Sequence, residues 1–98
     1  MTLRKGYWVI QCQDITDPAA MQEYADAWGA IAAEFGAAVI AGGGQLEVAE
    51  GATATRVLIV AFPSFRLAQD CYHSKQYQRA KIAALQAMAR SLSIVEGA

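Results

Sequence analysis

The feature that most constrains this chain is the unbroken apolar run from Val57 to Phe62. Alternate side chains of a strand point to opposite faces of its sheet, so a strand over residues 56–62 presents apolar groups on both faces. Such a strand is typical of the centre of a sheet that is covered on both sides. The run therefore predicts a buried central strand, and each of its two faces needs an apolar cover.

An amphipathic helix is predicted over residues 18–35. Asp17 and Pro18 are typical of a helix start, because Asp accepts hydrogen bonds from free backbone N–H groups and proline fits the first helical position. Gly36 is typical of a helix end. Between them, apolar side chains recur every three or four residues, as on one face of a helix. These side chains are Met21, Tyr24, Trp28, Ile31 and Phe35.

The remaining segments predict a second helix and three further strands. Ser64 and Ser74 are each typical of a helix N-terminus, so the second helix is expected to break near His73 and Ser74. Residues 42–44 are three glycines, which predict a bulge or bend within the second strand. The expected elements are strands over 7–13, 38–41 resuming at 46–50, and 92–96, with helices over 65–72 and from 74 to about 90.

This order, βαββαβ, predicts a single domain over residues 1–98 with an α+β, ferredoxin-like sandwich fold. Right-handed crossovers place both helices on one face of a four-stranded antiparallel sheet, with strands 7–13 and 56–62 at its centre. The opposite face then carries half of the apolar run and has no cover. Large apolar surfaces usually mark interfaces. We therefore predict a homodimer, a dimeric α/β barrel in which two copies pack through their open sheet faces.

Composition excludes several classes of function. Eight basic and nine acidic residues give a net charge of −1, without the basic excess of a nucleic-acid-binding protein. No apolar run approaches the roughly 20 residues of a membrane span, and the run after residue 6 is too short for a signal peptide. The protein is therefore expected to be cytoplasmic, with neither nucleic acid nor membrane as a partner.

The sequence predicts no metal site and no cofactor. Cys12 and Cys71 match no zinc or redox spacing and are expected to be reduced thiols buried as small apolar groups. The chain has a single histidine and lacks a close cluster of carboxylates, so it cannot supply the ligands of a metal ion. The three glycines are not followed by Lys-Ser/Thr or by a helix, so the physical basis of a phosphate loop is missing.

A series of short motifs, each weak alone, resembles a known bacterial family. In chain order they are Thr16-Asp17-Pro18 with Tyr24, Phe35-Gly36, Ala41 with Gly43-Gly44, Glu47-Val48, Glu50-Gly51, Val57 to Phe62 with Pro63-Ser64, Tyr72, Ser74, Tyr77-Gln78 and Val95-Glu96-Gly97. Their order and spacing, over nearly the whole chain, resemble a family of small bacterial domains of unknown function in the dimeric α/β-barrel superfamily.

The resemblance implies a ferredoxin-like protomer and a barrel-like dimer. Relatives in that superfamily include cofactor-independent monooxygenases and muconolactone isomerases, and some have small-molecule pockets between helices and sheet. The family has no settled activity that the resemblance could assign to this chain. Gly42 and Ala61 stand where the family often has Arg and Glu, so some charged groups of a family-wide site are absent here.

Two neighbouring residues are candidates for catalysis. His73 is the single histidine, and its imidazole could act as a general base near neutral pH. Tyr72 beside it offers a polar hydroxyl. Both lie at the expected break in the second helix, where an exposed histidine without a chemical role is the simpler interpretation.

Three residues are candidates for ligand binding. Trp28, with Tyr24 and Tyr72, could line an aromatic pocket between helices and sheet or could fill the core. Gln11, on a central strand, needs a hydrogen-bond partner across a dimer or in a polar cavity if it is buried. Arg56, at the start of the central strand, could contact an anion or lie at the surface beside a loop.

The sequence leaves two functions open. One is a homodimeric ferredoxin-like domain that binds a small organic metabolite, or serves as a scaffold, without chemistry. The other is a cofactor-independent enzyme, similar to a monooxygenase or isomerase, with a pocket between helices and sheet. A closed cavity of roughly several hundred Å³ that holds Tyr72, His73 or Gln11 would favour the enzyme. A solid core with these groups in solvent would favour the domain without chemistry.

Overall fold

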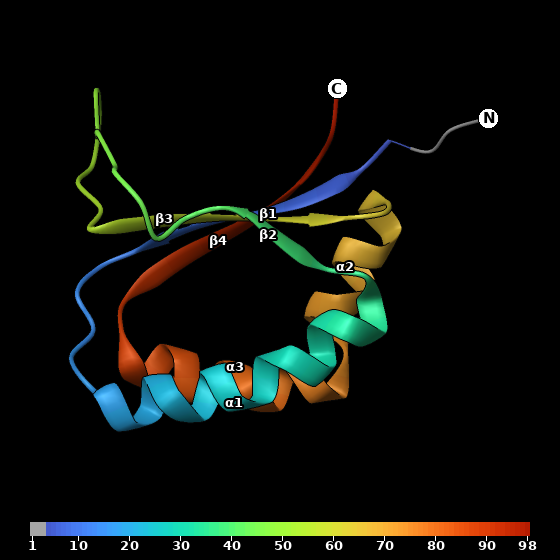
Figure 1. Cartoon of the computed structure of the whole chain (residues 1–98), viewed down its shortest axis with the longest axis horizontal. Helices are drawn as coiled ribbons and strands as arrows, with labels where there is room; N and C mark the ends of the chain where they lie inside the picture. The colour runs from blue at the N-terminus through green and yellow to red at the C-terminus, as the bar shows by residue number, and fades with distance from the viewer. Residues whose placement is uncertain (1–3) are drawn as a thin grey trace.

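A computed structural model describes residues 4–98 and shows a sheet with helices packed along one side (Figure 1). The elements are β1 (Gly6–Cys12), α1 (Pro18–Phe35), β2 (Ala38–Ala41), β3 (Arg56–Phe62), α2 (Phe65–His73), α3 (Lys75–Ala87) and β4 (Arg90–Glu96). The four strands are antiparallel in the order β2-β3-β1-β4. The predicted ferredoxin-like fold is confirmed, with β1 and β3 at the centre and an open sheet in the protomer.

Side-chain caps set the ends of the helices as the sequence predicts. The Asp17 carboxylate accepts a hydrogen bond from the Ala20 amide at 3.1 Å, and Gly36 ends α1 with a positive φ of 67°. Ser74 Oγ accepts a bond from the Tyr77 amide at 3.1 Å and donates one to the Cys71 carbonyl at 2.7 Å. One serine thus ends α2 and begins α3, which confirms the expected break.

Two boundaries differ from the prediction. No strand forms over 46–50, because Gly42 and Gly43 adopt positive φ values of 140° and 78° and turn the chain away from β3. The register shift in β2 lies between Val39 and Ala41, just before the glycines rather than at them. At the other end, α3 stops at Ala87 and β4 begins at Arg90, because that residue pairs with β1 in the sheet.

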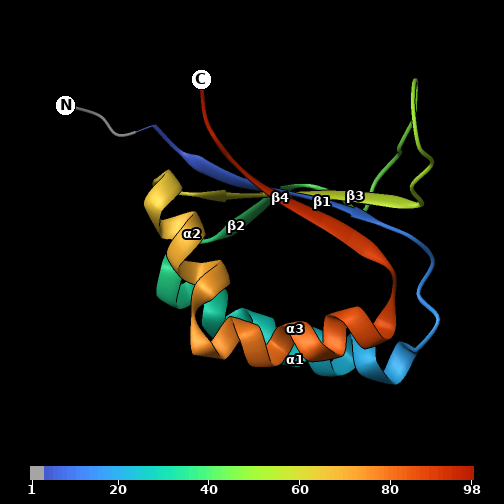
Figure 2. The ribbon, with the colours of Figure 1, turned by 180° about the vertical axis from the view of Figure 1, so that it is seen from behind.

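Trp8, on β1, lies at the centre of the core, and the helices cover the face of the sheet to which it points (Figure 2). Its side chain is fully buried, and its indole N–H donates to the Ala68 carbonyl at 3.0 Å. Its ring centroid lies 4.8 Å from that of Tyr77, 5.0 Å from Phe62 and 5.6 Å from Trp28. One side chain therefore joins β1 to β3 and to all three helices.

The two cysteines are free, buried thiols, as the sequence predicts. Burial raises the pKa of the Cys71 thiol to about 12, and the nearby Glu34 charge adds to the increase. Since the thiolate is the reactive form, Cys71 is an apolar packing group rather than a nucleophile.

We call the surface of the sheet that points away from the helices the outer face. Residues paired across an antiparallel sheet share a face, so the register places on it Tyr7, Val9, Gln11, Val57, Ile59, Ala61, Ser91, Ser93 and Val95. Its centre, on β1 and β3, is mainly apolar, and its β4 edge carries two serines. None of the helices within residues 4–98 covers it, and the loop over 42–55 stands on that side (Figures 1 and 2).

Candidate ligand-binding site

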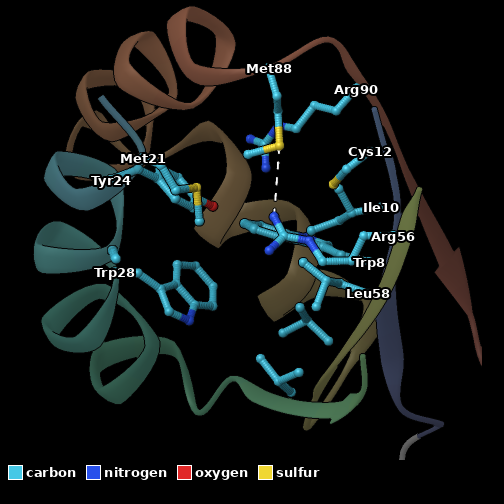
Figure 3. Close-up of a pocket in the computed structure, with 13 residues that line it drawn as sticks. Trp8, Ile10, Cys12, Met21, Tyr24, Trp28, Arg56, Leu58, Met88 and Arg90 are labelled. Atoms are coloured by element: carbon cyan, nitrogen blue, oxygen red, sulfur yellow. Dashed lines mark hydrogen bonds between the residues drawn. The ribbon is translucent and has the colours of Figure 1, made fainter. Parts of the chain in front are cut away.

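A pocket of about 260 Å³ lies between α1 and the helix-covered face of the sheet (Figure 3). Its lining is Trp8, Ile10, Cys12, Met21, Tyr24, Ala25, Trp28, Val39, Arg56, Leu58, Val60, Met88 and Arg90. Ala25 on α1 and Val39 on β2 are exposed to solvent, which places the mouth of the pocket between these two elements. The walls are aromatic and aliphatic, and the two arginines are the charged groups among the lining residues.

The short second strand explains why the sheet leaves space here. Because side chains alternate along a strand, Trp8 on β1 and Leu58 on β3 both point toward α1. Tyr24 and Trp28 are four residues apart on α1, so both side chains lie on the helix face that points toward the sheet. The chain leaves β2 at Ala41, which pairs with Ile59, so residues 56–58 of β3 have no strand partner on that side. Beyond Ala41 the sheet is therefore only three strands wide, and the pocket lies between this narrower part and α1.

Arg90 belongs to a hydrogen-bonded group of three side chains. Its Nη2 donates to the Tyr77 hydroxyl at 2.6 Å, and the Tyr77 and Tyr24 hydroxyl oxygens are 3.0 Å apart. The guanidinium carbon lies 5.2 Å from the centroid of the Tyr24 ring. Burial, with the neighbouring Tyr24, raises the pKa of Tyr77, so its phenol stays neutral. Burial alone would lower the pKa of Arg90, but the two tyrosines outweigh it and raise that pKa.

Arg56 approaches the same space from β3. Its Nη2 lies 3.8 Å from the Met88 sulfur, the contact drawn as a dashed line in Figure 3. Thioether sulfur is a weak acceptor and Arg56 is only partly buried, so most of its N–H donors stay available to solvent or to a ligand. Within residues 4–98 the ion pairs are Arg4 with Glu96 and Arg66 with Asp70, and neither pair lines the pocket.

The structure brings two of the candidate residues together and leaves the others apart. Trp28 and Arg56 both line the pocket. Gln11 is exposed on the outer face, on the opposite side of the sheet. Tyr72 is half-buried and lines a second cavity of about 130 Å³, which shares Arg90 with the pocket, and His73 is exposed at the end of α2. A role for any of these five in catalysis or binding stays a prediction.

Sequence reasoning missed Arg90 and its neighbour Met88 as pocket residues. Both were assigned to the end of the last helix, where a side chain at the surface is expected. The signal that could have found them is the alternation of Met88, Arg90, Leu92 and Ile94 with small residues, which has the period of a strand. A strand over 88–94 would have placed Arg90 on the same face as Leu92.

Residues 4–98 contain neither a cluster of metal ligands nor a helix that could span a membrane. In residues 4–98, no three His, Cys, Asp or Glu side chains gather closely enough to hold a metal ion. None of the helices in that range has both the length and the apolar character that crossing a membrane requires.

Comparisons with known proteins find one matching family and several solved structures of similar fold. A family model described as "Domain of unknown function (DUF1330)" matches residues 5–98. A solved protein of unknown function from Rhodopseudomonas palustris is 16% identical with a TM-score of 0.71, over 97% of this chain and 83% of that one. No curated protein matches.

Two other solved structures have the same fold at lower similarity. One is a dimeric protein of unknown function with a ferredoxin-like fold from Bacteroides fragilis, 13% identical with a TM-score of 0.58, over 94% of this chain and 95% of that one. The other is SnoaB, a cofactor-independent oxygenase from Streptomyces nogalater, 11% identical with a TM-score of 0.52, over 94% and 91%. At these identities the likeness shows the fold alone.

Proposed function

The chain belongs to the DUF1330 family of domains of unknown function, and from that premise we propose that it is a homodimeric domain that binds a small organic metabolite between α1 and the sheet. The observation that carries the proposal is the pocket itself. Its lining is apolar and aromatic with two guanidiniums, and ligand sites are typically apolar with a few polar groups that fix orientation. Its volume of about 260 Å³ is just below the roughly 300–1,000 Å³ of most ligand sites, which favours a molecule of one or two rings.

The outer face supports the homodimer. Its centre is built from apolar side chains of β1 and β3, and exposed Val95 extends it onto β4. At ~25 cal/mol per Å² of apolar surface, burying ~800 Å² per partner would offset the cost of association. A second copy is the simplest partner because a two-fold axis brings the same apolar surface to both sides. The similar Bacteroides fragilis protein is described as dimeric.

An enzyme remains the second candidate function. The observation that favours it is the Tyr24 hydroxyl, which lines the pocket and is linked through Tyr77 to the Arg90 guanidinium. Such a chain can stabilise a negative oxygen on a bound substrate, as cofactor-independent oxygenases and isomerases both require. His73 lies outside the pocket lining, so the tyrosine is the better placed polar group.

We propose the bacterial cytoplasm as the compartment. Free thiols are typical of a reducing compartment, and Cys12 and Cys71 are both free. The similar solved structures named above come from bacteria.

Ala25→Trp is expected to abolish stabilisation by ligand. Ala25 is an exposed α1 residue at the pocket mouth, so a larger side chain there obstructs entry without disturbing the core. In a thermal-shift screen against a metabolite library, a ligand at 100 times its Kd adds about 2.7 kcal/mol to wild-type stability, which raises Tm by roughly 10 °C. The variant should show no such shift with the same compounds.

The matched control is Ala33→Trp, an exposed alanine of the same helix that does not line the pocket. It should keep the wild-type shifts. The proposal fails if the library contains no compound that stabilises the wild type, or if stabilising compounds act equally on Ala25→Trp.

A further inference from the structure

We propose that the bound metabolite is a small organic carboxylate, whose acidic group is held between Arg56 and Arg90 and whose apolar body lies against Trp28 and Leu58. This inference rests on the proposed function, because it concerns the same pocket. It goes further by naming the chemical class of the ligand and the two residues that select it.

The sheet register places the two arginines on either side of one residue. Cys12 pairs with Arg56 on β3 and with Arg90 on β4, so the three residues form one row across the helix-covered face. Neighbouring strands lie about 4.8 Å apart, which puts the Cα atoms of the two arginines roughly 10 Å apart. Side chains of that length can converge on a group between them, and Figure 3 shows both entering the space beside Met88.

Neither guanidinium has a charged partner there. Each arginine offers five N–H donors. In the described part of the chain, the side-chain bonds of Arg56 and Arg90 go to the Met88 sulfur at 3.8 Å and to the Tyr77 hydroxyl at 2.6 Å. The ion pairs of that same part involve other arginines. Two guanidinium groups therefore face a pocket with mainly apolar walls and no acidic lining residue, where an anion would pair with both.

The tyrosines position one guanidinium without neutralising it. Tyr77 fixes Arg90 through a hydrogen bond, and the Tyr24 ring packs against it at 5.2 Å. Both partners are phenols rather than carboxylates, so the positive charge of Arg90 is left for a ligand. A donor held in place before binding loses little entropy when the ligand arrives.

The remaining walls define the rest of the ligand. Trp8, Trp28, Leu58 and Val60 contribute rings and branched aliphatic groups. A planar carboxylate matches the fork of N–H donors on a guanidinium in a bidentate arrangement. An aromatic or branched aliphatic carboxylate of one or two rings therefore fits the charge, the walls and the volume together.

The test compares two probes with the same body and different charge, naphthalene-2-carboxylate and naphthalene-2-carboxamide, by isothermal titration calorimetry. The wild type is expected to bind the carboxylate roughly tenfold or more tightly than the carboxamide, because hydrogen bonds to charged groups are the stronger ones. Added salt should weaken binding of the carboxylate and leave the carboxamide nearly unchanged. Arg56→Gln should remove most of the preference. Arg79→Gln, which removes the same charge from an exposed position of α3, should retain it.

The wild-type comparison keeps the test decisive even if a variant folds poorly. Equal affinities for the two probes would overturn the inference and leave the proposed function standing, since the pocket would still bind the naphthalene body. Absence of binding by either probe would also overturn it, and the proposed function would fall with it only if the metabolite screen gave no stabilising compound. A preference that survives Arg56→Gln but is lost in Arg79→Gln would show that the anion binds elsewhere.

Discussion

Ile59→Lys is expected to convert the protein from a dimer into monomers. Ile59 lies at the middle of the outer face, where it pairs with Val9 in the centre of the sheet. In a face-to-face dimer, the two-fold axis brings two new ammonium groups into one apolar interface. Unpaired buried charges cost several kcal/mol each, so two of them match the roughly 8 kcal/mol of net binding free energy that holds a micromolar dimer. Light scattering after gel filtration should give a mass near 10.5 kDa for the variant and near twice that for the wild type.

The matched control is Ile82→Lys, the same chemical change on α3. Ile82 is 67% exposed and lies in the helical layer, away from the outer face. This variant should keep the dimeric mass. A wild type that is monomeric at micromolar concentration, or an Ile59→Lys variant that keeps the dimeric mass, would contradict the proposed interface.

Trp8→Ala is expected to remove most of the stability of the fold. Trp8 is fully buried, packs against Phe62, Tyr77 and Trp28, and hydrogen-bonds the Ala68 carbonyl. Replacing a buried tryptophan by alanine typically costs about 3–5 kcal/mol, out of the roughly 5–15 kcal/mol that stabilises a native domain. Urea unfolding should therefore show a midpoint far below that of the wild type, or no cooperative transition.

Trp8→Phe separates packing from hydrogen bonding at the same position. Phenylalanine keeps most of the aromatic contacts but loses the hydrogen bond to the Ala68 carbonyl, at a cost of about 0.5–1.5 kcal/mol. Its unfolding midpoint should lie between those of Trp8→Ala and the wild type. A loss below about 1 kcal/mol for Trp8→Ala would show that Trp8 is not the centre of the core.

Much of the fold could be predicted because local signals agree with one another. The apolar run of β3 predicts a central strand, and Asp17, Gly36 and Ser74 mark helix ends where the caps are found. The failure at residues 46–50 has a simple cause. Alternation in a sequence indicates a strand only if a partner edge is in reach, and Gly42 and Gly43 direct the chain away from that edge.

The candidate site was only half predictable. Trp28 and Arg56 reach the pocket because the apolar face of α1 and the first residue of β3 both point into the space between the helices and the sheet. Gln11 does not, because it shares its face of β1 with Tyr7 and Val9 and that face points away from the helices. Arg90 was missed because the site depends on a boundary. The predicted helix runs to about residue 90, but α3 ends three residues earlier, at Ala87, so Arg90 lies on the helix-covered face of the sheet.

Nuclear magnetic resonance of the tryptophan indoles tests the pocket most directly. The chain has two tryptophans, and both line the pocket between α1 and the sheet. In proton–nitrogen correlation spectra during titration with naphthalene-2-carboxylate, both indole N–H signals should move and saturate together, while the side-chain amide of Gln11 on the outer face stays in place. Indole signals that remain fixed while Gln11 or other outer-face signals move would contradict the assignment of the pocket as the binding site.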